Sequence, residues 1–189
     1  AMLGSSFGFV ALVVHQIPYL ETQIGVSKAV ASSSIAVFTL ASIVGRVGFG
    51  YLGDRYSKRI VLAGGIAMLS FGLALLATAS TLWVAMLAIG IAAPGFGGTI
   101  PLRPSMAADY FGTRNFGTIN GTMQFLSTTG GAAGPWVVGR VVDVEGDYTM
   151  GWVIAAIVVA VVGVPAALAA TAPSKLRAEH RPAPRIAPS

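Results

Sequence analysis

Long apolar runs alternate with short polar breaks along almost the whole chain. Asp, Glu, Lys and Arg are absent from residues 1–20, 29–45, 60–102, 115–139 and 148–174. A helix needs about 20 apolar residues to cross a bilayer, and the run over 60–102 is long enough for two crossings. The pattern therefore predicts an all-α integral membrane fold with six transmembrane helices, over residues 2–20, 28–53, 58–78, 82–109, 116–138 and 148–171.

Composition supports a membrane protein. The 189 residues are 54% hydrophobic and 10% charged, with a mean hydropathy of +0.76, whereas soluble domains carry about 25% charged residues. Cysteine is absent from the sequence, so neither a disulfide nor a thiolate metal site is expected, and no cofactor is expected either. Residues 1–20 lack a basic n-region and a clear cleavage site, which favours a helix entered near its beginning over a signal peptide.

The cations lie mostly at one set of alternate helix ends. Ten of the 12 Lys and Arg residues belong to this set: Arg46, Arg55, Lys58, Arg59, Arg103, Arg114, Lys175, Arg177, Arg181 and Arg185. Only Lys28 and Arg140 lie at the other set. The positive-inside rule then makes the first set cytoplasmic, so we expect both termini inside the cell (inner or plasma) membrane. The net charge of +5 reflects this topology, which makes the lipid bilayer an expected partner and nucleic acid an unexpected one.

The last residues have a different character. After Pro173 the chain is rich in proline and in basic residues. Such composition does not build a packed core, and its cations are attracted to anionic lipid. Residues 173–189 are therefore expected to form a disordered basic cytoplasmic tail.

Charge is most concentrated in residues 45–59, between two apolar runs. Gly50 and Gly53 lack side chains, so two helix ends can approach each other closely there. Asp54 is placed to cap the N-terminus of the next helix. The cations that follow would face the anionic cytoplasmic lipid surface: Arg55, Lys58 and Arg59. From this chemistry alone, the segment is either a gate or a positively charged turn that fixes orientation.

Residues 50–59, Gly-Tyr-Leu-Gly-Asp-Arg-Tyr-Ser-Lys-Arg, resemble the cytoplasmic signature loop of the major facilitator superfamily. Six positions agree, counting Lys58 as a basic equivalent, and Ser57 replaces a glycine. The resemblance implies that the six helices are one half of a twelve-helix transporter, so a second six-helix half, from the parent chain or another copy, is an expected partner. It also implies a gate formed by these residues: Gly50, Asp54, Arg55, Lys58 and Arg59.

The same segment contains a second pattern. Gly48-x-Gly50-x-x-Gly53 matches the dinucleotide-binding fingerprint, which requires a preceding strand and a following helix in a soluble βαβ unit. Here the glycines close an apolar helix. We therefore interpret this match as accidental.

Three basic side chains fall within or beside the predicted spans. Arg46 lies eight residues before Asp54, about 12 Å deeper in the membrane. A guanidinium there is costly unless it meets water or an anion, and its planar fork suits a carboxylate. Arg46 is thus a candidate substrate-binding residue, with snorkelling to the headgroups or pairing with the signature loop as the alternative. His15 is a candidate for substrate binding or proton relay, or else an anchoring polar group near an interface. Arg103 follows a Gly- and Pro-rich segment and is expected at the membrane interface rather than in the site.

A narrower resemblance involves residues 109–117, 134–135, 139–140, 143 and 146–148. They resemble the end of helix ten through helix twelve of the monocarboxylate transporter and oxalate/formate antiporter branch. Arg46, with Gly50 four residues later, matches that branch's substrate-binding arginine in helix eight. The resemblance covers nearly the whole chain and implies transport of a small organic anion, a monocarboxylate or dicarboxylate, by alternating access.

Two departures from that branch affect the mechanism. Ser42 stands where animal monocarboxylate carriers have a proton-coupling aspartate. Residues 115–139 contain no basic residue to match the second cation of the oxalate exchanger. Proton symport and anion exchange both stay open, as does the identity of the substrate.

Two other classes of function were weighed. An intramembrane enzyme would need metal ligands or a nucleophile with its base, and we expect neither H-E-x-x-H, G-x-S-x-G nor paired carboxylates in the spans. His15 has no obvious acidic partner at membrane depth, so no enzymatic activity is expected. A six-helix scaffold or inactive fragment without transport activity would show the same pattern and differ only in lacking uptake.

Overall fold

The computed structural model describes residues 1–112 and 116–170. The helices follow one another as α1 (Met2–Thr22), α2 (Lys28–Arg55), α3 (Lys58–Ala77), α4 (Leu82–Phe111), α5 (Phe116–Glu145), α6 (Thr149–Val158), the π-helical turn η1 (Val159–Gly163) and α7 (Val164–Leu168). In this part of the chain no residue is in a strand. The predicted all-α fold is confirmed.

Five helical segments are long and apolar enough to cross a membrane: α1, α2, α3, α4 and the continuous stretch Thr149–Leu168. The remaining helix, α5, has 30 residues and is long enough, but polar side chains occur throughout its first half: Thr118, Asn120, Thr122, Gln124, Ser127, Thr128 and Thr129. A helix of this composition needs neighbours or a polar space along one face.

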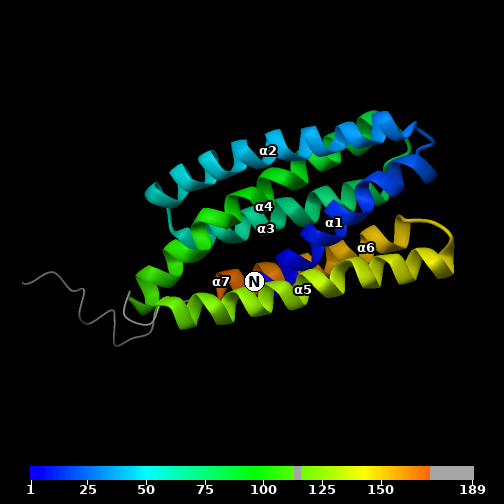
Figure 1. Ribbon diagram of the computed structural model, residues 1–189. Helices are drawn as coiled ribbons and strands as arrows, with labels where there is room; N and C mark the ends of the chain where they lie inside the picture. Colours follow the sequence, from blue (N-terminus) through cyan, green and yellow to red (C-terminus); the bar gives the residue numbers. More distant parts are fainter. Residues whose placement is uncertain (113–115, 171–189) are drawn as a thin grey trace, which may run out of the picture.

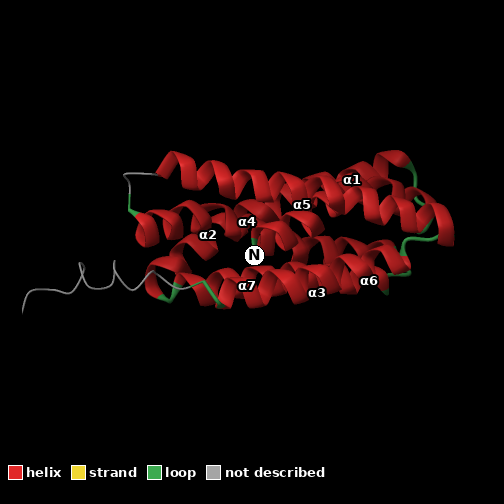
Figure 2. Ribbon diagram, turned by 90° about the horizontal axis from the view of Figure 1, so that it is seen from below, coloured by secondary structure: helices red, strands yellow, loops and turns green. Residues whose placement is uncertain are grey.

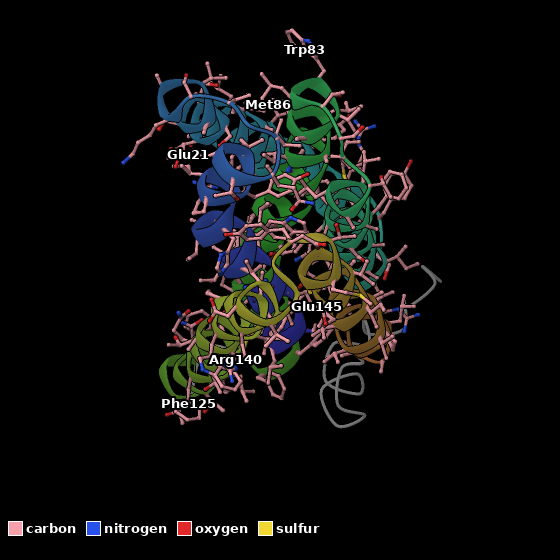
Figure 3. All side chains as sticks on the ribbon, turned by 90° about the vertical axis from the view of Figure 1, so that its right-hand side faces the viewer. Glu21, Trp83, Met86, Phe125, Arg140 and Glu145 are labelled. Atoms are coloured by element: carbon pink, nitrogen blue, oxygen red, sulfur yellow. The ribbon has the colours of Figure 1, made fainter. Side chains whose placement is uncertain are left out.

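The helices run up and down along one bundle axis (Figures 1 and 2). The connections after α1, α3 and α5 lie at one end of the bundle, and the connection after α2 lies at the other (Figure 1). Helix α2 packs mainly on α4, α5 packs mainly on α1, and α3 joins α4 to α6. Seen along the axis, α2 and α5 lie on opposite sides of α1 (Figure 3).

Close helix contacts depend on glycine at several places, among them Gly134 and Gly45. A Cβ atom at Gly134 of α5 would collide with the carbonyl oxygen of Phe7 in α1, and one at Gly45 of α2 would collide with the backbone of Pro94 in α4. Backbone atoms cannot move aside as the end of a side chain can. These two glycines therefore allow the α1–α5 and α2–α4 pairs to approach.

One expected boundary is wrong at the end of α5. The predicted helix ends at residue 138, but α5 continues to Glu145. The reason is that Arg140, Asp143 and Glu145 are exposed, so the helix accommodates them without burying charge, and α5 ends at one end of the bundle (Figure 1). Gly146, with φ of +79°, follows the last helical residue.

The predicted cap at Asp54 is also wrong. Helix α2 includes Asp54 and continues to Arg55, because the N–H of Tyr56 still donates to the carbonyl of Leu52. Ser57 is the N-cap residue of α3. The expected tail over 173–189 lies outside the described residues.

Candidate functional site

A cavity of about 700 Å³ lies between α1, α4 and α5. The wall formed by α1 and α4 is mostly apolar, and the wall formed by α5 carries most of the polar side chains. The residues that define it include Ser6, Phe9, Phe96, Arg103, Asn120 and Gln124. The polar face of α5 therefore borders this cavity.

Arg103 is the charged residue among those lining the cavity. Its Nη2 donates a hydrogen bond of 2.7 Å to the Oγ of Ser5 in α1. Its Cζ lies 5.3 Å from the centre of the Phe96 ring, within range of a cation–π interaction. The Phe96 ring in turn stacks on Phe9, with 3.5 Å between the ring centres. The guanidinium is thus held between α4 and α1.

Arg103 is expected at the membrane interface, and its side chain also lines the cavity. It lies within the predicted helix over 82–109, and α4 continues through Pro101 and Pro104 to Phe111. Arg103 is therefore a partly buried helical residue, on the face that meets α1. Sequence spacing could have indicated the cavity, because Asn120, Gln124 and Ser127 recur at the interval that places residues on one helix face.

Arg46 has a different environment. Its side chain is exposed on α2, while the neighbouring Gly45 packs on Pro94 of α4. It is not among the residues that line the cavity. Within the described residues it has no ion-pair partner. The guanidinium groups of Arg46 and Arg103 therefore lie in separate surroundings.

His15 lies in the contact between α1 and α5. Its Nε2 is 3.0 Å from the carbonyl oxygen of Pro135, and a Cβ atom at Gly139 would meet the imidazole ring at ordinary contact distance. The ring centre lies 5.7 Å from that of Tyr148. The residue is partly buried and does not line the cavity. This geometry favours the anchoring alternative, because the imidazole joins two helices.

At the opposite end of the bundle, Lys58 joins the start of α3 to the end of α4. Its Nζ lies 2.6 Å from the Oδ2 of Asp109 and donates to the Oγ of Ser105 at 2.6 Å. The side chains of Lys58 and Asp109 are 26% and 50% exposed, so the pair contributes about 0.2–1 kcal/mol at most. The contact fixes α3 against α4 within this chain.

The other residues of the signature segment are more open. Arg55 lies over the ring of Tyr51, 4.5 Å from its centre, and Asp54 and Arg59 are exposed. A Cβ at Gly50 would meet nothing within 4 Å of the described residues, whereas one at Gly53 would collide with the Leu102 side chain. Close approach within this chain thus involves Gly53.

The expectation that the spans lack the letters G-x-S-x-G is wrong. Residues 4–8, Gly-Ser-Ser-Phe-Gly, match the letters of the hydrolase nucleophile motif G-x-S-x-G. That motif requires a sharp strand-to-helix turn, but here all five residues lie inside α1. The hydroxyl of Ser6 hydrogen-bonds with that of Ser127 at 2.5 Å. The match does not indicate a catalytic serine.

Membrane-length helices packed around a partly polar cavity that holds an arginine are typical of a multi-pass membrane transporter. The sequence profile of the Major Facilitator Superfamily matches residues 1–188, so the chain belongs to that superfamily. The proteins of this superfamily are transporters rather than enzymes. The fold agrees. A crystal structure of the fucose:proton symporter FucP of E. coli superposes with a TM-score of 0.71 at 20% identity, over 85% of this chain and 39% of that one.

Two relatives are similar in sequence. The probable nitrate/nitrite transporter NarK2 of Mycobacterium tuberculosis is 31% identical over 153 residues, which cover 76% of this chain and 37% of the relative. Monocarboxylate transporter 13 of Rattus norvegicus is 30% identical over 154 residues, covering 78% of this chain and 35% of that protein. The chain thus spans little more than a third of the length of these relatives.

Proposed function

We propose that this chain is the C-terminal half of a secondary transporter that moves a small organic anion, a monocarboxylate or dicarboxylate, by alternating access. The observation that carries the proposal is the pair of guanidinium groups on the membrane-length helices α2 and α4, Arg46 and Arg103, which have no carboxylate partner within the described residues. A charge at membrane depth is costly unless it meets water or an anion. The guanidinium fork matches the two oxygens of a carboxylate.

In this proposal Arg46 binds the substrate between the two halves. Its exposure on α2 supports that role, because the face that carries it is left uncovered by the other helices of this chain. His15 is a second candidate for substrate contact, although its Nε2 already meets the Pro135 carbonyl.

The signature segment serves as the cytoplasmic gate. Its residues Gly50, Asp54, Arg55 and Arg59 lie at the end of the bundle where α2 gives way to α3, and Lys58 ties that end to α4. Exposed charges can change partners as the second half approaches and withdraws, whereas the extensive packing of α3 on α4, to which the Lys58–Asp109 pair adds one contact, keeps this half rigid. Rigid halves that move about a fixed site are what alternating access requires.

A second candidate substrate is nitrate or nitrite. The 31% identical relative is named a probable nitrate/nitrite transporter, and nitrate, like a carboxylate, is a planar oxyanion that a guanidinium fork can bind with two hydrogen bonds.

The test is uptake by a complete transporter that contains this half, purified and reconstituted in liposomes. We expect saturable uptake of radiolabelled lactate, pyruvate or oxalate. An imposed pH gradient and an internal anion load distinguish proton symport from exchange. The 189-residue chain alone is expected to give no uptake, because a facilitator's pathway lies between its two halves.

Three outcomes would decide against parts of this proposal. Uptake of nitrate without any carboxylate would select the second candidate. Absence of uptake for every anion by a folded complete protein would favour the scaffold alternative. Saturable uptake by a demonstrated monomer of this chain would contradict its assignment as one half.

We further propose that both termini are cytoplasmic in the inner or plasma membrane. The end of the bundle formed by the α2–α3 connection carries Arg55, Lys58 and Arg59, and cations mark the cytoplasmic side. Because the chain lacks cysteine, a single introduced cysteine gives this chain one thiol, and its labelling shows on which side of the membrane that position lies. Impermeant thiol reagents should label Lys28→Cys and Asp147→Cys from outside and Arg59→Cys only after permeabilisation; the reverse pattern would overturn the orientation.

A further inference from the structure

We propose that the cavity around Arg103 is a second anion-binding site, separate from Arg46, for a small planar oxyanion such as a carboxylate or nitrate. The two positions differ in depth. Gly45, next to Arg46, lies against Pro94, whereas Gly53 lies against Leu102, next to Arg103. Eight residues along α4 correspond to about 12 Å. The Arg103 site is thus closer than Arg46 to the end of the bundle that carries the signature segment.

The guanidinium of Arg103 is positioned before any ligand arrives. Ser5 accepts one hydrogen bond at 2.7 Å and the Phe96 ring lies beneath the charge. A guanidinium has five N–H donors, so most of its donors remain for another acceptor. Fixing a cation in advance reduces the entropy lost when an anion binds.

The opposite wall supplies further donors. Asn120, Gln124 and Ser127 of α5 border the same cavity, and amide and hydroxyl groups donate hydrogen bonds to oxyanions. The Ser6–Ser127 hydrogen bond joins α1 to α5 at this wall. Among the described residues that line the cavity there is no Asp or Glu, so no carboxylate neutralises Arg103 or repels an anion.

Size and polarity favour a soluble anion. A volume of about 700 Å³ accommodates a carboxylate of a few carbons with several waters, each of which occupies about 30 Å³ in the liquid. Phe9 and Phe96 form the apolar side of the cavity, where the substituent of a monocarboxylate would pack. The phosphate of an anionic lipid offers the same oxyanion chemistry, so the experiment has to separate these two sources.

The test is calorimetric titration of the purified 189-residue chain in an uncharged detergent with lactate and with nitrate. Lactamide, which lacks the negative charge, is the ligand control. We expect saturable binding of both anions and none of lactamide. Arg103→Gln should weaken anion binding about ten- to a hundred-fold, the range for a charge-assisted contact. Arg140→Gln, an exposed arginine on α5 outside the cavity, is the matched control and should bind as the wild type does.

Two further variants test the site in case Arg103→Gln does not fold. Arg103→Lys keeps the charge but loses the fork, and should also weaken binding about tenfold. Gln124→Ala, at an exposed position on the opposite wall, should weaken it about two- to tenfold. Folding is checked by circular dichroism and size-exclusion chromatography.

Several results would overturn the site. One is equal anion affinity in the wild type and the folded Arg103 variants. Another is that Arg46→Gln abolishes anion binding whereas Arg103→Gln leaves it unchanged. Binding of phosphatidylglycerol in nanodiscs that neither lactate nor nitrate displaces would assign the cavity to a lipid headgroup instead. Since this binding is measured on the chain alone and transport on the complete transporter, the two proposals can fail separately.

Discussion

Arg46→Lys in a complete transporter that contains this half should raise the apparent substrate constant by about ten- to a hundred-fold, although the positive charge is kept. Lysine presents a point charge, whereas the planar guanidinium fork binds both oxygens of a carboxylate. The exposed position of Arg46, beside the α2–α4 contact at Gly45, gives the lysine no new partner among the described residues. The measurement is the initial rate of uptake against substrate concentration in proteoliposomes.

Matched variants separate binding from gating. Arg140→Lys makes the same chemical change at an exposed position of α5 and should leave the apparent constant unaltered. Asp54→Asn and Arg55→Gln, in the signature segment, should slow the conformational step and affect substrate affinity less. Equal substrate affinity of the wild type and Arg46→Ala, measured directly on folded protein, would contradict substrate binding by Arg46. It would favour the alternative in which the Arg46 side chain extends to the lipid headgroups.

The helices could be predicted because a membrane-spanning helix requires an uninterrupted run of mostly apolar residues, which is visible in the sequence. The run 60–102, for example, contains no charged residue and yields α3 and most of α4. The end of α5 was mislocated because charge marks where a chain leaves the bilayer, not where its helix ends. Exposed Arg140 and Glu145 extend the helix beyond the apolar part at little cost.

The surroundings of the candidate site residues depend on packing between helices distant in sequence. Arg103 meets Ser5 across 98 residues, and His15 meets Pro135 across 120. Periodicity shows that two residues share a helix face but not which neighbouring helix covers that face. The signature segment could be found because its residues are contiguous, whereas the cavity required the structure.

Gly45→Ala should destabilise the bundle by about 1–3 kcal/mol, the usual cost of overpacking. The added methyl group would collide with the backbone of Pro94, and α4 could relieve the clash only by moving away from α2. That movement would separate Ser42 from Gly97 and Phe49 from Gly98, which lie along the same contact. The measurement is the unfolding midpoint of the purified chain in detergent, followed by circular dichroism.

Gly48→Ala provides the matched control, because it makes the same change on the same helix three residues away. A Cβ at Gly48 meets nothing within 4 Å of the described residues. Alanine also loses less conformational entropy than glycine when a helix forms, so this variant should be neutral or more stable by up to about 1 kcal/mol. The contrast isolates packing from helix propensity, since propensity favours alanine equally at both positions. Equal midpoints for the two variants would show that α2 does not pack on α4 through Gly45, and the placement of Arg46 beside that contact would have to be abandoned with it.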